Sequence, residues 1–279
     1  MKRCVLNICI CFTAVLMITQ VKADVVLQAD FDSADKIVTT GGKGSLVTYS
    51  TNKATVETAP SLAATAGGFL RVDARADSKP GLAGGVTIKP DSADSSLAAM
   101  SQIVEGKVVL NGAIEFFFRS SEDPTGGMSV MRVIDVAGSA DGLRIVILSH
   151  NGKPRIELIG PANTNSFQPT RGKAGRVIAP EIGLVMESQT VYHLAIGFAT
   201  DDKGLVTMTM YAAEGPVAID SKNALSTVTF TLDHAAVKSG FSDKPFFFGK
   251  SGQAGTPTLQ DFDCLRLYNK LPQTFEALK

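Results

Sequence analysis

The feature that most constrains this chain is an alternation of apolar and polar side chains with a period of two residues. In 205–211, Val206, Met208 and Met210 fall on one face and the threonines fall on the other. A period of two is that of a β-strand with one buried face. The same period occurs in 113–119, 142–148 and 191–198, although in 142–148 the second face is largely apolar as well.

Short turns separate these segments. Asn151-Gly152 lies between 143–148 and 155–159, and both residues accept the positive φ of a type I′ hairpin turn. Thr200–Gly204 joins two further strands in the same way. Helical periodicity is confined to 96–104, 232–238 and 274–278, where Thr274 is placed to cap a short helix. The pattern predicts an all-β domain, built as a two-sheet antiparallel sandwich or barrel.

About a dozen strands are expected in total. Besides the segments above, the candidates are 25–32, 45–50, 68–73, 85–88, 107–110, 128–136, 182–186, 226–231, 245–248 and 261–268. Strict alternation along the last of them puts Leu265 and Leu267 on the same face as Asp263, with Cys264 and Arg266 on the opposite face.

The first 23 residues have the pattern of a secretory signal peptide. Lys2 and Arg3 precede an apolar run, and Val21-Lys22-Ala23 places small residues at the −3 and −1 positions of a cleavage site. The run is short for a membrane span, which needs about 20 apolar residues. We therefore expect a mature chain of one domain, 24–279, that is secreted, periplasmic or exposed at the cell surface.

Cysteine content and charge further limit the kinds of protein that this chain can be. Of the four cysteines, only Cys264 lies outside the signal segment, so the mature domain has no internal disulfide. Lysine plus arginine and aspartate plus glutamate both number 27. The absence of a net positive charge argues against a nucleic-acid partner. A lone cysteine in an apolar strand is most often a small packing residue.

Three segments, in this order, resemble a known family. Gly112–Arg119, Val191–Phe198 with its following hairpin, and Asp263–Leu271 with the residues after it are similar to three strands of bacterial laminin-G-like domains. These domains belong to the concanavalin A-like lectin/glucanase superfamily. The resemblance covers most of Val25–Lys279 and implies a jelly-roll sandwich of two antiparallel sheets. The chain departs from the family pattern at Phe117 and Tyr192, where the family has tryptophan, and at Cys264, where it has aspartate.

The resemblance also implies a structural calcium ion that joins an early segment to the head of the last strand. The matching residues are Asp30, Asp32 and Asp263. Carboxylates and backbone carbonyls are the ligands that calcium prefers. The alternative is that these aspartates flank strands and solvate turns, as Asp201 and Asp202 are expected to do.

Catalytic motifs are weak in this sequence. Glucanases of the superfamily carry Glu-x-Asp-x-Glu or Glu-x-Asp-x-x-Glu on one strand, and no such run occurs here. Glu115 is isolated, while Asp261 and Asp263 share a strand face but lack a third acid. The three histidines are far apart in sequence and are read as structural or solvated: His150, His193 and His234.

Carbohydrate binding usually needs exposed aromatic rings, and the chain has no tryptophan and only four tyrosines. Most phenylalanines fall within strand patterns and are read as core residues. Phe167 is different, because it lies in a polar loop with Asn163, Asn165 and Gln168. We take this loop as the candidate surface for a glycan or a protein partner.

Three functions are consistent with these observations. The first is a secreted, non-catalytic module that binds a glycan or a surface protein. The second is a divergent carbohydrate-active enzyme, either a glycoside hydrolase or a polysaccharide lyase. The third is a structural domain of a cell-envelope assembly.

Overall fold

The structure is a computed structural model of the 279-residue chain. It describes residues 23–31, 48–52, 54–58, 61–63, 67–73, 85–90, 92–120, 131–136, 142–150, 153–161, 166–168, 175–178, 184–248 and 259–277. Residues 1–22 of the signal segment, Asp32, Asn163 and Asn165 lie outside these residues.

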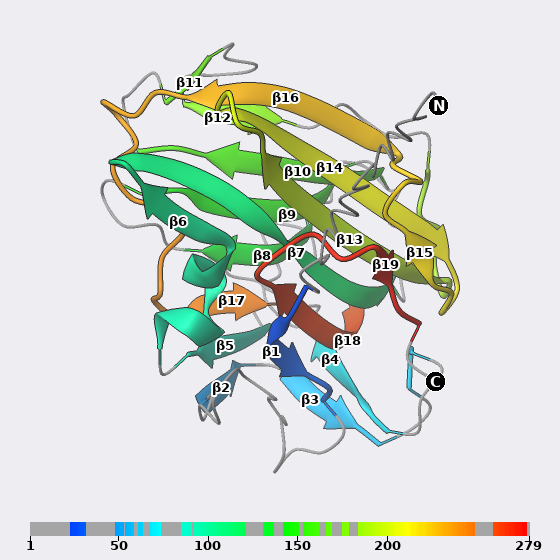
Figure 1. Ribbon diagram of the computed structural model, residues 1–279. Coiled ribbons are helices and arrows are strands. Elements are labelled where there is room, and N and C mark those ends of the chain that lie inside the picture. The colour runs from blue at the N-terminus through cyan, green and yellow to red at the C-terminus, as the bar shows by residue number, and fades with distance from the viewer. Residues whose placement is uncertain are drawn as a thin grey trace, which may run out of the picture.

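Two antiparallel sheets make up the domain (Figure 1). The larger sheet has ten strands in the order β11-β16-β14-β13-β7-β18-β4-β3, with β1 beside β18 and β6 beside β7. Their bounds are β1 Val25–Ala29, β3 Ala54–Glu57, β4 Phe69–Asp73, β6 Ser101–Val104, β7 Lys107–Ser120, β11 Phe167–Gln168, β13 Val191–Thr200, β14 Leu205–Glu214, β16 Ser226–Leu232 and β18 Leu259–Tyr268.

The smaller sheet has seven strands in the order β12-β10-β9-β8-β17-β5-β2. Their bounds are β2 Thr48–Asn52, β5 Gly85–Lys89, β8 Met131–Val136, β9 Arg144–His150, β10 Lys153–Ile159, β12 Arg176–Ile178 and β17 Phe246–Phe248. A separate pair joins β15, Ile219–Asp220, to β19, Thr274–Phe275.

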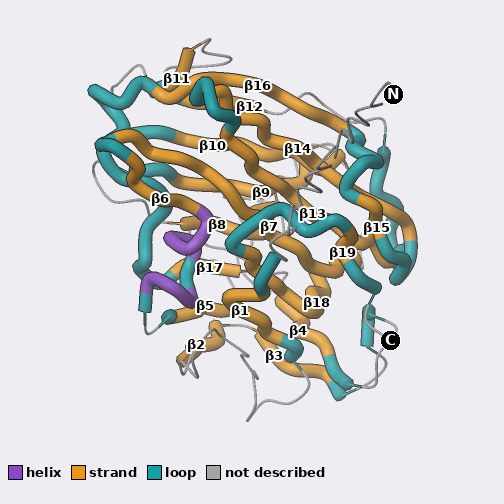
Figure 2. The backbone as a smooth tube through the Cα atoms, in the orientation of Figure 1, coloured by secondary structure: helices purple, strands orange, loops and turns teal. Residues whose placement is uncertain are grey.

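The all-β prediction is confirmed. Figure 2 shows strands throughout, and helix is confined within the described residues to two short 3-10 turns, η2 (Ala93–Ser95) and η3 (Leu97–Met100). The expected helical turn at 96–104 becomes η3 followed by β6. The expected terminal helix is wrong, because Thr274 begins β19 and pairs with Asp220 instead of capping a helix.

The main core lies between the two sheets. Period-two alternation points one face of each strand inward, and phenylalanines from both sheets meet there. The ring of Phe248 on β17 lies 5.8 Å from that of Phe116 on β7 and 4.9 Å from that of Phe262 on β18. These contacts hold the smaller sheet against the larger one.

Two expected strands merge into β7, a single strand of 14 residues. Gly112 separates them in sequence, but it does not break the strand. A Cβ at this position would lie 2.5 Å from Tyr268 O and 2.6 Å from Met100 Cγ. The glycine is therefore required by a close approach of neighbouring groups.

Both expected hairpins are confirmed. His150 pairs with Lys153 across a two-residue connection, and β13 pairs with β14 beyond Asp201. The Asp201 carboxylate accepts hydrogen bonds from the backbone N–H groups of Lys203 and Leu205, at 3.0 and 2.8 Å. This aspartate shapes the turn, as expected.

The last strand contains an irregularity that the alternation did not predict. Cys264 has a φ of +48°, and the pairing of β18 with β7 shifts between Asp263 and Arg266. Such a bulge puts two consecutive residues on one side of the sheet. Asp263 therefore lies on the outer face with Cys264 and Arg266, so its expected position beside Leu265 and Leu267 is wrong.

The outer face of the larger sheet is covered as well. At one end, Leu62 and Ala63 pack over Phe69, Phe117 and Cys264. At the other, the strap lies over the sheet; we use this name for residues 217–220 and 271–276, which contain the paired strands β15 and β19 (Figure 1). In the described part of the chain, no helix has the length and apolar character needed to cross a membrane.

Candidate functional site

Phe167 does not form a binding platform. Its side chain is fully buried, and its ring packs edge-on against Phe230 at 5.5 Å. The segment is the short edge strand β11, which pairs with Leu232 and Thr231 of β16. The prediction of an exposed aromatic at this loop is therefore wrong, because a two-residue strand turns the ring inward. Asn163 and Asn165 lie outside the described residues, and Gln168 is placed only through its backbone pairing.

Asp263 anchors the segment 61–63. Its Oδ2 atom accepts hydrogen bonds from Ser61 Oγ at 2.7 Å, Leu62 N at 3.0 Å and Ala63 N at 3.2 Å. Its Oδ1 atom accepts one from Cys264 Sγ at 3.3 Å. Burial raises the pKa of Asp263, although these hydrogen bonds partly offset the effect. The side chain ties a loop to a strand about 200 residues later in the chain.

The calcium site stays a prediction. Asp30 accepts a hydrogen bond from Gln28 Nε2 at 2.7 Å, and Asp32 lies outside the described residues. The described residues contain no group of three histidine, cysteine or acidic side chains that could hold a metal ion. Burial raises the pKa of the Cys264 thiol, and the charges of Asp263 and, to a smaller extent, Asp30 raise it further.

A buried polar cluster lies on the outer face beside Asp263. It was not predicted because its residues are far apart in sequence. Glu115 of β7, His193 of β13, and Arg266 and Tyr268 of β18 meet there. His193 Nε2 lies 2.8 Å from Glu115 Oε1, and Arg266 Nη1 lies 3.3 Å from Glu115 Oε2. The Tyr268 hydroxyl donates a short hydrogen bond to Glu115 Oε2. We call these four residues the Glu115 cluster.

The Glu115 cluster is sealed from solvent. Glu115 and His193 are 0 % exposed, and Arg266 is 4 % exposed. Burial raises the pKa of Tyr268, and the Glu115 charge raises it further. Burial lowers the pKa of Arg266, but the Glu115 carboxylate, Tyr268 and Cys264 together outweigh it and the net shift is upward. A carboxylate–imidazole pair can serve acid–base catalysis only where a substrate can reach it. Here the pair is part of the interior.

A second buried carboxylate, Asp261, joins two arginines of neighbouring strands. Arg71 Nε donates to Oδ1 at 2.8 Å, while Arg119 Nη2 donates to Oδ2 at 2.6 Å. Both guanidinium groups lie over the ring of Phe69, at 5.1 and 5.2 Å. The aspartate pair that suggested catalysis is thus divided between two structural tasks: Asp261 holds arginines and Asp263 holds a loop.

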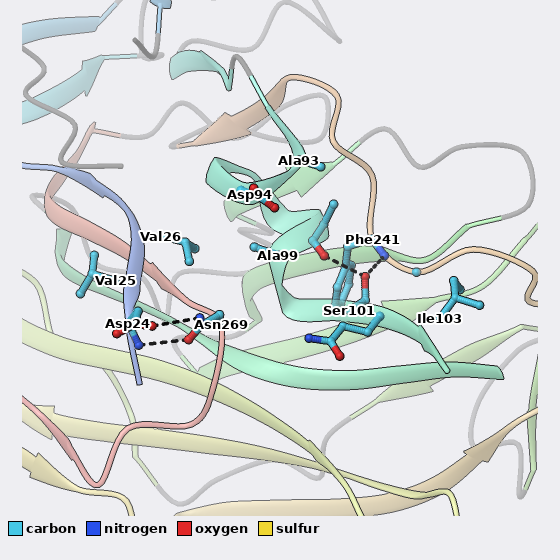
Figure 3. Close-up of a pocket in the computed structure, with 13 residues that line it drawn as sticks. Asp24, Val25, Val26, Ala93, Asp94, Ala99, Ser101, Ile103, Phe241 and Asn269 are labelled. Atoms are coloured by element: carbon cyan, nitrogen blue, oxygen red, sulfur yellow. Dashed lines mark hydrogen bonds between the residues drawn. The ribbon is translucent and has the colours of Figure 1, made fainter. Parts of the chain in front are cut away.

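A cavity of about 520 Å³ opens at the other end of β18 (Figure 3). We call it the β6 pocket. Its lining comes from the start of β1, the η2–η3 segment, β6, the 240–241 turn and the residue after β18. The lining residues are Asp24, Val25, Val26, Ala93, Asp94, Ala98, Ala99, Ser101, Gln102, Ile103, Gly240, Phe241 and Asn269.

Ser101 fixes the wall of the β6 pocket. Its hydroxyl donates to Ala98 O at 3.2 Å and accepts from Phe241 N at 2.9 Å, so it joins η3 to the 240–241 turn. A Cβ at Gly240 would lie 2.0 Å from the Ser101 hydroxyl oxygen. Ser96 caps η3 by accepting from Ala98 N at 3.1 Å. The wall is held by side-chain bonds between segments far apart in sequence.

Asn269 holds the opposite rim. Asp24 N donates to Asn269 Oδ1 at 3.0 Å, and Asn269 N donates to Asp24 O at 3.2 Å (Figure 3). Beyond the rim, Ile103 and Val104 of β6 are 55 % and 48 % exposed. The lining therefore combines small apolar side chains, two carboxylates and two amides, and it includes no basic residue.

Sequence reasoning did not find the β6 pocket. The segment 96–104 was expected to be helical, so Gln102 and Ile103 were not placed on a strand edge. The signal that could have found it is the Val104-Glu-Gly-Lys107 turn. Glu105 and Gly106 both have positive φ, 50° and 75°, as a two-residue hairpin requires.

No family model and no curated protein matches the sequence. Solved structures do match the fold. The binding domain of Paraclostridial Mosquitocidal Protein 1 is 10% identical, with a TM-score of 0.53, over 92% of this chain and 50% of that one. The receptor-binding domain of the botulinum neurotoxin C/D mosaic serotype is 12% identical, with a TM-score of 0.53, over 88% and 48%. The botulinum neurotoxin serotype G binding domain is 10% identical, with a TM-score of 0.52, over 88% and 48%.

The chain thus spans about half the length of the chains it matches. At this level of identity the likeness concerns the fold. All three are binding or receptor-binding domains.

Proposed function

We propose that this domain is a non-catalytic binding module and that it recognises an extended segment of a surface protein at the β6 pocket. The observation that carries the proposal is the β6 pocket itself. Its volume lies within the range of ligand sites, and its small apolar lining is bordered by Asp24, Asp94 and exposed Ile103. A basic residue flanked by apolar ones would complement this surface.

The edge of β6 supports an extended partner. Among the described strands, β6 pairs only with β7, through Ser101–Leu110 to Val104–Lys107. No other described strand pairs with its second edge, and many domains bind a peptide strand through backbone hydrogen bonds at such an edge. The likeness of fold to binding domains of toxins also supports a binding module over an enzyme.

A glycan is the second candidate partner. It is less well supported because of where the aromatic side chains lie. Every phenylalanine and tyrosine whose side chain the structure describes is buried. Stacking of a sugar ring needs an exposed aromatic face. Without such a face, a glycan would form hydrogen bonds with the hydroxyl group of Ser101 and the carboxylate groups of Asp24 and Asp94.

The fold and compartment are proposed on sequence grounds. We infer a jelly-roll of the laminin-G-like type, for which the two packed antiparallel sheets give support. We also propose export by a cleaved signal segment 1–23. N-terminal sequencing of the secreted protein would test it; a mature chain that begins far from Asp24 would contradict it.

The calcium proposal has its own test. If Asp30, Asp32 and Asp263 hold calcium, the thermal midpoint rises in calcium relative to chelator, because a ligand that binds only the folded state stabilises it. An unchanged midpoint would contradict calcium binding.

Peptide selection tests the binding function. A random-peptide phage library and a glycan array are probed with residues 24–279, and the best-enriched peptide is synthesised for titration calorimetry. We expect peptides with a basic residue beside apolar ones. Ile103→Ser should weaken binding about tenfold, which is the loss of about 1.4 kcal/mol of apolar contact. Leu225→Ser is the matched control, because Leu225 is 47 % exposed and is not part of the pocket lining.

If Ile103→Ser and Leu225→Ser weaken peptide binding equally, the β6 pocket is not the binding site. Enrichment on the glycan array without any selected peptide would replace the protein partner with the second candidate.

A further inference from the structure

The Glu115 cluster connects the outer face of the larger sheet to the strap. His193 Nδ1 lies 2.6 Å from Val217 O, and Arg266 Nη1 lies 3.4 Å from Glu276 O. Both carbonyls belong to the strap. Its paired strands are joined further by Ser221 N, which donates to Gln273 O at 2.9 Å. The hydrogen bonds of one buried cluster thus fix two segments of the strap.

Hydrogen-bond chemistry determines how many protons this cluster holds. A backbone carbonyl only accepts, so His193 Nδ1 must carry a hydrogen toward Val217 O. The contact of 2.8 Å between His193 Nε2 and Glu115 Oε1 needs a second hydrogen, because an imidazole lone pair and a carboxylate oxygen repel each other. The pair therefore holds one proton more than a neutral imidazole and a carboxylate.

The surroundings place that proton on His193. Glu115 also accepts from the Tyr268 hydroxyl and faces the Arg266 guanidinium, which are the partners of an ionised carboxylate. The ring of Phe117 stacks on the imidazole at 4.4 Å, an arrangement that favours a cationic ring. Arg266 Nε and Nη2 have no hydrogen-bond partner among the described residues, and Glu115 is the carboxylate that pairs with the Arg266 charge.

We propose that the Glu115–His193 pair is a proton-dependent lock that holds the strap on the sheet. Loss of the proton to solvent base leaves the Nε2 lone pair facing Glu115 Oε1, and the strap loosens. Among the described residues, the other charged or titratable groups at this face are Arg266 and Tyr268 beside Glu115, Tyr211 of β14 under the strap, Asp263 and Cys264 farther along β18, Asp261 with Arg71 and Arg119 beyond them, and Asp30 on the β1 side. The described strap presents only backbone carbonyls to the pair.

Nitrogen NMR tests the proton directly. In the folded wild-type chain labelled with ¹⁵N, long-range proton–nitrogen spectra at neutral pH should show both ring nitrogens of His193 in the protonated form. A lone-pair signal from Nε2 would overturn the proposal. This measurement needs no variant.

Hydrogen exchange tests the strap. The protection factor of Ser221 N–H in wild type should fall about tenfold or more from about pH 6 to about pH 9.5, after correction for the intrinsic exchange rate. In Glu115→Gln the amide hydrogens replace the removable proton, so protection should change by less than about twofold over the same range. Glu157→Gln is the matched control, because Glu157 is 7 % exposed and pairs with Arg155 and Arg176 in the smaller sheet; it should behave as wild type.

If Glu115→Gln shows the same loss of protection as wild type, the pair is not the lock. If that variant fails to fold, the nitrogen spectrum of wild type still decides.

Discussion

The two faces of the larger sheet are both buried, but they are built in opposite ways. The inner face packs phenylalanines such as Phe116 and Phe262 against Phe248 of the smaller sheet. The outer face carries Glu115, His193, Asp261 and Arg266 under the strap and the 61–63 segment. Apolar packing is non-directional, whereas buried charges need defined partners. The outer face is therefore where this fold depends on individual hydrogen bonds.

Acidic residues on one face of a strand are therefore weak evidence for a catalytic site. A strand with one polar face suggests solvent or a catalytic groove on that side. Here the polar side chains pair with one another across β4, β18, β7 and β13, and short segments cover them. The two most exposed large apolar side chains of the described residues, Ile103 and Val104, lie on β6 at the end of the sheet.

Loss of the buried Glu115 carboxylate should give the largest decrease in stability. Glu115→Ala leaves Arg266 and His193 without their carboxylate, so we expect a loss of about 3–5 kcal/mol in the free energy of unfolding. Denaturant unfolding measures it. Phe248→Ala on the inner side should cost about 3–5 kcal/mol by creating a cavity.

The control is Glu157→Ala in the smaller sheet, where the arginine partners are 25 % and 46 % exposed. Water can solvate those partners, and the expected cost is about 1 kcal/mol or less. A similar cost for Glu115→Ala and Glu157→Ala would remove the distinction between the two sites.

Loss of the Asp263 anchor should come next. Asp263→Ala removes the acceptor for three donors of 61–63, so we expect a loss of about 1–3 kcal/mol. Hydrogen exchange should place the effect at Leu62 and Ala63. Loss of protection that is spread evenly over the domain would contradict a local anchor.

The smallest expected effect is the change of the free energy of unfolding with pH that Asp263 causes. Burial raises the pKa of Asp263 above its ordinary value of 3.8. Protonation therefore favours the folded state, and this contribution is complete below the ordinary pKa and is lost as the pH rises through the folded-state pKa. Asp263→Asn cannot titrate, so its free energy of unfolding should rise relative to wild type across that window. A difference that does not change with pH would show that this carboxylate keeps its unfolded-state pKa.

Much of the inner face could be predicted from the sequence. Period two marked the core residues of β7, β13 and β14. Asn151-Gly152 and Thr200–Gly204 predicted the β9–β10 and β13–β14 hairpins. These signals are local, because strand alternation and turn chemistry involve neighbouring residues.

The outer face and the pocket could not be predicted in the same way. Glu115, His193 and Arg266 are far apart in sequence, and only strand order brings them together. The bulge at Cys264 moved Asp263 to the outer face, and such a bulge leaves no pattern in one sequence. Phe167 was misplaced because its polar neighbours suggested a loop, whereas tertiary packing turned its ring inward.

We propose that recognition occurs at the β6 pocket and that the polar outer face is structural. One titration series tests it: the selected peptide is titrated into wild type, Ile103→Ser and Glu115→Gln, with folding of each confirmed by circular dichroism. We predict that Ile103→Ser weakens binding about tenfold and that Glu115→Gln changes it by less than about twofold. Weakening by Glu115→Gln with no effect of Ile103→Ser would contradict the account and return the polar outer face to consideration as the binding site.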